Sequence, residues 1–248
     1  MPYPIAAVRS KGLSSPVATG LMAGLIHYWT LDEASGTRHD SVGSAHLTPV
    51  NSPTAVEGKH GNAVDLEEDS LQYFESDQII DWSGNFTFAC WVKVEELPLV
   101  TIYNTLVHDG GVFSGCGIEI KNSFNGDLAF IFFRGNTPPP WNEYCITHAG
   151  TMATVGYWDL FIATHNAATK TIEASSFGDD HVLHKYTNTY AWANAAPHAE
   201  NFRLGINRAG EQSWDGLIDE VGIWNRVLSD HELVELYNSG NGKTYPLT

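Results

Sequence analysis

The sequence predicts an all-β fold: a two-sheet antiparallel jelly-roll sandwich with one short C-terminal helix and an extended N-terminal arm. Three observations favour it. Charged residues are only 17% of the 248 residues, so the polar surface comes from residue types that suit strands and turns. Short alternating apolar runs recur along the chain, and Asn-Gly, Asp-Gly and Gly-Gly steps separate them. Many short strands with regular turns are typical of a β-sandwich.

Residues 1–24 form the predicted arm. They contain Arg9 and Lys11 but no acidic residue, and their proline, glycine and serine content favours an extended segment over a helix. Residues 25–248 hold all 29 acidic residues and are expected to form one domain. A disordered tail and a basic strap that binds a neighbouring subunit both fit such an arm.

The predicted strands begin with Leu25–Trp29. The clearest run is Phe86–Val94, in which alternate residues are apolar and share one face of a strand. The later runs, which turn clusters also separate, are 116–120, 128–133, 154–164, 169–175, 202–206 and 217–224. Their number and spacing predict antiparallel sheets.

One helix is predicted near the C-terminus. Ser229 and Glu232 have the spacing of a capping box, in which the serine hydroxyl accepts from the third helical amide and the glutamate returns to the N-cap amide. Apolar residues follow at helical spacing, and Gly240 is expected to end the helix. This helix is expected to cover one end of the sandwich.

The composition excludes several classes of partner. A net charge of −16 repels phosphate backbones, so we expect no nucleic acid partner, and it attracts cations. The longest apolar run, 128–133, is far shorter than the roughly 20 residues that span a bilayer, so we expect no membrane insertion. Prolines and basic residues interrupt any signal-peptide core in the arm. Cys90, Cys116 and Cys145 are odd in number and lack metal-ligand spacing, which argues against a disulfide scaffold.

Four segments carry a family resemblance: residues 28–36 with the turn 40–43, then 58–66, 86–93 and 214–229. In this order they resemble the LamG-like jelly-roll domains of the concanavalin A-like lectin/glucanase superfamily. The resemblance covers roughly residues 25–240 and is poor over 94–157. It implies a concanavalin A-like sandwich whose inner strands are buried on both faces. This fold hosts lectins, adhesion modules, hydrolases and structural proteins, so it does not by itself give a function.

The resemblance also implies a structural Ca²⁺ that ties the first segment to the last strand. Its candidate ligands are Asp32, Asp40 and Asp219, since Ca²⁺ takes six to eight oxygen ligands and carboxylates supply them. An alternative is that Asp40 forms an Asx-turn with residues 41–43 and that the other two acids pair with bases or cap loops.

Two stretches offer the aromatic rings and amides that suit a glycan. Pyranose rings stack on aromatic faces while their hydroxyls take directed hydrogen bonds. The candidates are Trp141 and Tyr144 in the first stretch, and Tyr190 and Trp192 in the second. These side chains are equally suited to packing over loops or lining a subunit interface.

Catalytic motifs are absent from the sequence. No strand carries the paired acids that a retaining glycosidase needs, and Asp219 and Glu220 are adjacent, so a regular strand would point them to opposite faces. HExxH and GxSxG are also missing. We therefore expect a protein that is not an enzyme.

These observations favour a non-enzymatic binding or structural protein. The predicted function is a LamG-like module that its arm, through Arg9 and Lys11, anchors in a larger assembly. A bacteriophage virion surface component, either capsid decoration or tail-associated, combines an exterior domain with the lack of a secretion signal. Its expected partners are other protein subunits, including copies of itself, and glycans. The alternatives are a free secreted or cell-surface carbohydrate-binding module and, less favoured, a polysaccharide hydrolase.

Overall fold

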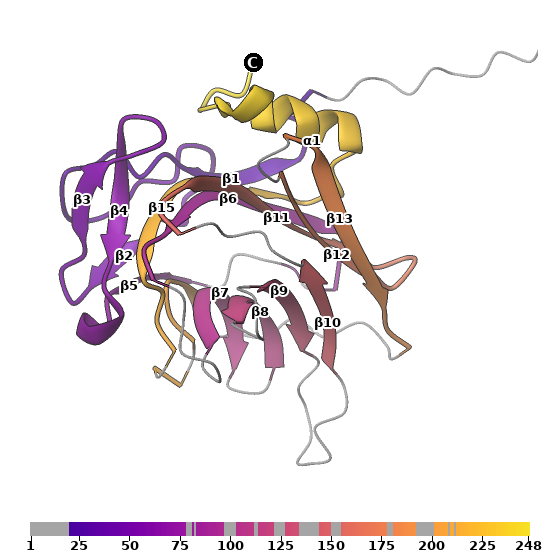
Figure 1. The fold of residues 1–248 in the computed structure, drawn as a ribbon, viewed down its shortest axis with the longest axis horizontal. Coiled ribbons are helices and arrows are strands. Elements are labelled where there is room, and N and C mark those ends of the chain that lie inside the picture. The colour runs from indigo at the N-terminus through magenta and orange to yellow at the C-terminus, as the bar shows by residue number, and fades with distance from the viewer. Residues whose placement is uncertain are drawn as a thin grey trace, which may run out of the picture.

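The computed structural model describes residues 20–77, 81, 83–96, 103–111, 114–121, 127–133, 144–149, 155–177, 181–191, 201–207, 209–210 and 212–248. In this part of the chain two antiparallel sheets face each other, and one α-helix lies outside them (Figure 1). The predicted all-β jelly-roll sandwich with one short helix is confirmed. Among the residues described, no helix has the length and apolar character needed to cross a membrane.

The first sheet has eight strands. Seven follow the order β13-β12-β11-β6-β15-β4-β3, and β1 pairs with β15 outside this path. Their bounds are Leu25–Trp29 (β1), Thr54–Glu57 (β3), Asn62–Leu66 (β4), Phe86–Val94 (β6), Trp158–Asn166 (β11), Thr171–Phe177 (β12), Leu183–Thr189 (β13) and Gly216–Trp224 (β15). Every residue of β15 is buried, as expected of an inner strand covered on both faces.

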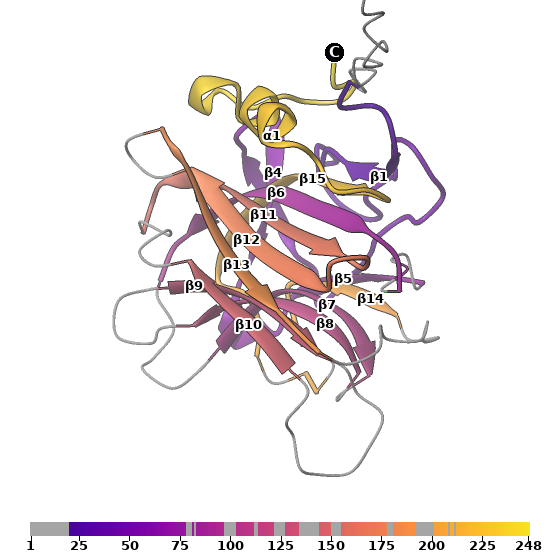
Figure 2. The same ribbon diagram turned by 90° about the vertical axis from the view of Figure 1, so that its right-hand side faces the viewer.

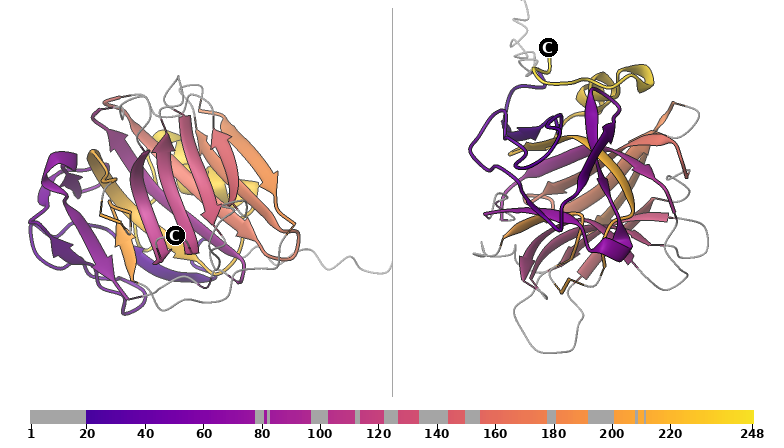
Figure 3. Two further views of the ribbon diagram at one scale, coloured as in Figure 1. Left: turned by 90° about the horizontal axis from the view of Figure 1, so that it is seen from below. Right: turned by 90° about the vertical axis from the view of Figure 1, so that its left-hand side faces the viewer.

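The second sheet has seven strands in the order β10-β9-β8-β7-β14-β5-β2. Their bounds are Thr48–Val50 (β2), Tyr73–Ser76 (β5), Tyr103–Gly111 (β7), Ser114–Lys121 (β8), Asp127–Phe133 (β9), Tyr144–Ala149 (β10) and Phe202–Leu204 (β14). Figure 3 (left) looks onto this sheet, with the helix on the far side of the molecule.

The main core lies between the two sheets. It includes Trp29 of β1, Phe88 of β6, Phe74 of β5 and Ile218 of β15, all fully buried. Burial of such side chains contributes about 1.5–3 kcal/mol each to folding, so this layer is the main source of stability.

A second apolar cluster covers the outer face of the eight-stranded sheet. Here Trp91 and Trp224 cluster with residues of helix α1 (Asp230–Tyr237) and with Leu247, the penultimate residue. Figure 2 shows the helix lying over this sheet. Leu21 is 1% exposed in this cluster, and its carbonyl oxygen accepts a hydrogen bond from the Trp224 indole at 2.6 Å. Residues 20–24, which the prediction assigns to the arm, thus include a residue that packs on the sandwich. Arg9 and Lys11 of the arm lie outside the described residues.

The capping box predicted for the helix is present. Ser229 accepts a hydrogen bond from the Glu232 amide, and the Glu232 carboxylate accepts one from the Ser229 amide at 2.9 Å. The helix ends earlier than predicted, because Asn238 already adopts the left-handed conformation that stops it (φ 49°), two residues before Gly240. A short 3₁₀ segment, Asn238–Gly240 (η2), follows.

Most predicted strands agree with the structure within a few residues. Leu25–Trp29 and Phe86–Val94 have the predicted bounds. The strand predicted from residue 154 begins only at Trp158, because residues 155–157 lie in the turn before β11. The prediction missed β2, β3, β4, β5, β7, β10 and β13, and also the 3₁₀ segment Glu68–Ser70 (η1).

Candidate functional site

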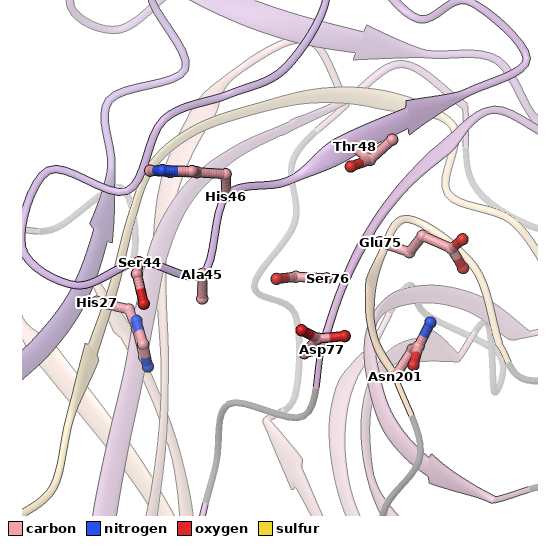
Figure 4. Close-up of a pocket in the computed structure, with 9 residues that line it drawn as sticks. All are labelled: His27, Ser44, Ala45, His46, Thr48, Glu75, Ser76, Asp77 and Asn201. Carbon is pink, nitrogen blue, oxygen red and sulfur yellow. The ribbon is translucent and has the colours of Figure 1, made fainter.

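A polar cleft lies at the margin of the sandwich, where β1 of one sheet approaches β2 and β5 of the other. Its volume is about 510 Å³. It is lined by His27, Ser44, Ala45, His46, Thr48, Glu75, Ser76, Asp77 and Asn201. Figure 4 shows His27 and Ser44 on one wall and Glu75, Asp77 and Asn201 on the other. Hydroxyl, amide, imidazole and carboxylate groups thus converge on one opening.

The first wall is held in place by a buried carboxylate. Asp40 is 7% exposed, and its Oδ2 lies 2.6 Å from Nδ1 of His27. Burial disfavours the charged form, but the hydrogen bonds from His27 and the backbone amides outweigh it and lower the pKa of Asp40. Because this carboxylate is ionised and can only accept, His27 donates to it through Nδ1, which leaves Nε2 free to face the cleft. The imidazole also stacks on Trp29, at a centroid distance of 5.6 Å.

The turn after Asp40 is fixed by the same carboxylate. The amides of Val42 and Gly43 donate to Asp40 Oδ1 at 3.0 and 2.9 Å, which is the Asx-turn that the sequence offered as an alternative. A side chain at Gly43 would bring its Cβ to 2.7 Å from Asp40 Oδ2 and 2.8 Å from His27 Nδ1, so only glycine fits. This turn carries Ser44 to the edge of the cleft.

The second wall is formed where β5 ends. Glu75 and Ser76 are its last residues, Asp77 follows, and Asn201 immediately precedes β14. Strand β14 pairs with β5 through Phe202 opposite Ser76, which brings Asn201 to the cleft. The Glu75 carboxylate lies 3.8 Å from Nε of Arg203, close to the limit of an ion pair.

Asp219 and Glu220 lie at a β-bulge of β15, where the strand changes partners. Residues 216–218 pair with β4, and residues 221–224 pair with β1. Glu220 has a φ of 51°, and the register with β6 shifts between Asp219 and Gly222. Ile218 and Val221, on either side of the pair, both belong to the core between the sheets. The expectation that the two acids face opposite sides is therefore wrong, because the bulge breaks the alternation.

Both acids are buried outside the main core, beneath the C-terminal segment. Burial raises the pKa of Asp219 to about 8, and the charge of Glu220 adds to the shift. Burial likewise raises the pKa of Glu220 to about 7, and the charge of Asp32 adds, although hydroxyl donors from Thr244 and Tyr28 oppose it. No salt bridge joins either acid to a basic side chain within the described part of the chain.

Comparison with known families decides the superfamily. Residues 66–234 match the sequence profile described as the concanavalin A-like lectin/glucanases superfamily, which is more than half of the chain. The chain belongs to this superfamily. Comparison with curated protein sequences finds no match.

Solved structures with the concanavalin A-like fold resemble the chain over most of its length. Domain 4 of AbnA, an extracellular GH43 arabinanase from Geobacillus stearothermophilus solved with arabinotriose, superposes with a TM-score of 0.62 at 18% identity, over 85% of this chain and 97% of that domain. The binding domain of botulinum neurotoxin DC, solved with SialylT, gives 0.66 at 13% identity, over 88% of this chain and 52% of that one. The binding domain of Paraclostridial mosquitocidal protein 1 gives 0.64 at 16% identity, over 88% and 52%. This chain thus spans about half of the two toxin binding domains.

The three predicted calcium ligands do not meet in one place in this concanavalin A-like domain. The carboxylate oxygens of Asp40 already accept hydrogen bonds from His27 and from backbone amides. Asp32 and Asp219 both hold the turn between β3 and β4: Asp32 accepts from the Asn62 amide and Asp219 from the His60 amide, each at 2.9 Å. Within the described residues, three acids whose oxygens lie within 4.8 Å of one another occur elsewhere, at Asp65, Glu67 and Glu95.

One of the four predicted sugar-binding aromatic side chains is described. Tyr190 is 6% exposed, and its hydroxyl lies 2.5 Å from Nε2 of the buried His165, so its ring does not offer a face to a sugar. Tyr144 begins β10, but its side chain lies outside the described part of the structure, as do Trp141 and Trp192.

The sequence prediction missed the cleft altogether. Its residues come from four separate segments around positions 27, 44–48, 75–77 and 201. The one local signal is the pair of acids Glu75 and Asp77, two residues apart at the end of a short strand. The pairing of β5 with β2 and β14, which brings the other residues to them, has no local sequence signal.

Proposed function

We propose that the chain is a non-enzymatic saccharide-binding module and that the cleft of Figure 4 is its binding site. The observation that carries the proposal is the convergence of hydroxyl, amide, imidazole and carboxylate groups on an opening of about 510 Å³. Sugar hydroxyls donate and accept hydrogen bonds, so a site that offers both kinds of partner suits them. The His27 imidazole and the Asn201 amide face each other across the opening.

Two of the similar structures support saccharide binding at the level of the fold. One was solved with arabinotriose and another with SialylT, so the fold is compatible with saccharide ligands. An extracellular location follows from the proposal, since polysaccharides are mainly exposed outside cells. Contacts of the ligand with Trp141, Tyr144 and Trp192 stay predictions.

Binding rather than hydrolysis is favoured by the position of the acids. A glycosidase needs a protonated general acid beside the scissile bond. The acids whose pKa is raised furthest, Asp219 and Glu220, are 0% and 4% exposed and do not line the cleft. Release of reducing sugar by the wild-type protein but not by a Glu75→Gln variant would replace the proposal with the hydrolase alternative.

Removing polar groups from the cleft is expected to weaken saccharide binding without affecting folding. Thr48→Ala and Asn201→Ala should each raise the Kd for a bound oligosaccharide about 3–10-fold, because each loses hydrogen bonds worth about 1 kcal/mol. Thr54→Ala, which changes an exposed threonine of β3 outside the cleft, is the matched control. Glycan-array screening followed by calorimetric titration measures the change. Equal binding by all four proteins would place the site elsewhere.

A structural Ca²⁺ stays a prediction, with two places to test it. One is the buried pair Asp219 and Glu220, which has no basic partner among the described residues. The other is the group of Asp65, Glu67 and Glu95, whose oxygens lie within 4.8 Å of one another. Asp40 belongs to neither. At the buried pair, a bound cation would supply positive charge that keeps the carboxylates ionised and ties β15 to the first segment.

Anchoring in a larger assembly, such as a bacteriophage virion, stays a prediction for the arm. Deletion of residues 1–19 rather than 1–24 is the appropriate test, because residues 20–24 pack on the domain. The truncated chain should keep the wild-type melting temperature and lose its place in the assembly. Sedimentation of both proteins from their native source measures this, and a truncated chain that still sediments with the particle would exclude anchoring through Arg9 and Lys11.

A further inference from the structure

The lining residues that carry a permanent charge at neutral pH are both acids, Glu75 and Asp77. No lysine or arginine lines the cleft, and its remaining basic groups are the imidazoles of His27 and His46. The Glu75 carboxylate lies 3.8 Å from Nε of Arg203, near the limit of an ion pair. Asp77 is exposed and forms no ion pair with a described residue. Behind the opposite wall, the Asp40 carboxylate adds a further negative charge.

We propose that the cleft selects saccharides that carry a protonated amine and excludes those that carry carboxylate or sulfate groups. This inference rests on the proposed saccharide-binding function and names the chemical class of its ligand. The fitting residue is a 2-amino-2-deoxy sugar, in which one ammonium group stands beside several hydroxyls.

The geometry gives each part of such a residue a partner. An ammonium group offers three donors and no acceptor, so it requires acceptors. Asp77 supplies carboxylate oxygens that form no ion pair with a described residue. The hydroxyls of the sugar are left to Thr48, Asn201 and His27, which supply hydroxyl, amide and imidazole partners. An anionic sugar would bring a further negative charge next to Asp77 and Glu75, with no lining lysine or arginine to offset it.

The expected preference for the amine over the N-acetyl saccharide is modest, because Asp77 is exposed. An exposed ion pair is weak, but a charge-assisted hydrogen bond is roughly twice as strong as a neutral one, so we expect about five-fold tighter binding of the amine than of its N-acetyl counterpart. A uronate of equal length should bind at least ten-fold more weakly than the N-acetyl form. The preference should shrink between low salt and 0.5 M salt, because the screening length falls below about 5 Å.

The test is calorimetric titration of the full chain with three oligosaccharides of equal length: a glucosamine oligomer, its N-acetylated form and a glucuronate oligomer. Asp77→Asn should bring the ratio of amine to N-acetyl affinity close to one. Asp69→Asn removes an exposed charge from η1, outside the cleft, and should leave the ratio at its wild-type value. A ratio that survives in Asp77→Asn would overturn the inference, because the selectivity would lie elsewhere.

The outcomes separate this inference from the function on which it rests. Equal binding of all three oligomers, or tighter binding of the glucuronate, overturns the charge selection but leaves a saccharide-binding module. Failure of the glucosamine and N-acetyl forms together with every neutral glycan of an array overturns the proposed function itself. Amine-dependent binding that Thr48→Ala and Asn201→Ala weaken supports both.

Discussion

Replacing Asp40 with alanine is expected to lower the free energy of unfolding by about 3–5 kcal/mol. The carboxylate accepts from Nδ1 of His27, from the Tyr28 amide at 3.1 Å and from three amides of the following turn. Alanine would leave these donors without an acceptor in a site that is 7% exposed in the native protein. Urea denaturation of the wild type and the variant measures the loss.

Asp81 offers a matched control. It forms an exposed Asx-turn in which Oδ1 accepts from the Ser83 amide at 2.9 Å, so Asp81→Ala removes the same kind of turn without burial. We expect a cost of about 1 kcal/mol or less there. A similar loss in both variants would mean that the turn, and not the buried network, determines the effect of Asp40.

The pH dependence of Asp40 has a definite sign. Its pKa is lowered in the folded protein, so its contribution to stability is present above about pH 4, the ordinary aspartate value, and is lost as the pH falls below that. The stability difference between wild type and Asp40→Ala should therefore shrink at pH 2–3. The variant should also bind saccharide more weakly at neutral pH, because His27 loses the group that orients it.

Local signals explain which parts of the fold the sequence predicts. The capping box between Ser229 and Glu232 forms within one helical turn, so neighbouring residues suffice to identify it. Strand β6 is recognisable because its apolar residues alternate over nine positions. The short strands β2 and β14, with three residues each, give too little alternation to be identified or bounded reliably from the sequence.

The cleft and the acid pair depend on contacts that no local pattern encodes. The cleft joins residue 27 to residue 201 through strand pairing between distant segments. The positive φ of Glu220 arises where β15 exchanges β4 for β1, and this exchange follows from the order of strands in the sheet. A sequence reading that assumes regular alternation therefore places Asp219 and Glu220 on opposite faces.

Raising the pH from 5 to 8 in the presence of EDTA is expected to destabilise the protein through this acid pair. The folded pKa values, about 8 for Asp219 and about 7 for Glu220, exceed the ordinary values of 3.8 and 4.5. Between roughly pH 4 and these values the folded state holds protons that the unfolded state has released, so stability falls as the pH rises. Each retained proton changes the free energy of unfolding by about 1.4 kcal/mol per pH unit, or roughly 3 kcal/mol between pH 5 and pH 7.

The variant Glu220→Gln isolates this contribution from other titrating groups. Glutamine keeps the shape of the side chain near Tyr28 and removes the titration, so the slope of stability against pH should become shallower and the variant should exceed the wild type in stability at pH 8. Other groups with shifted pKa values, such as the buried His165 and the half-buried Asp215, contribute equally to both proteins and cancel in the difference. Chemical denaturation at half-unit pH steps measures the slope of stability against pH for both proteins. Parallel curves for the wild type and the variant would show that the acid pair is not the source of the pH dependence.

If the acid pair holds a cation, adding Ca²⁺ should reverse the order of stability that the wild type and Glu220→Gln show at pH 8 in EDTA. Binding requires ionised carboxylates, so Ca²⁺ should raise the melting temperature more at pH 8 than at pH 5 and should release protons when it binds. At 100 times its Kd the ion would add about 2.7 kcal/mol to the free energy of unfolding. Glu220→Gln should lose most of this gain, whereas Glu67→Gln, in the separate acidic group with Asp65 and Glu95, should keep it. If Glu67→Gln loses the Ca²⁺-dependent rise in melting temperature and Glu220→Gln keeps it, the cation binds at Asp65, Glu67 and Glu95. The acids of the bulge would then be neutralised by protons alone.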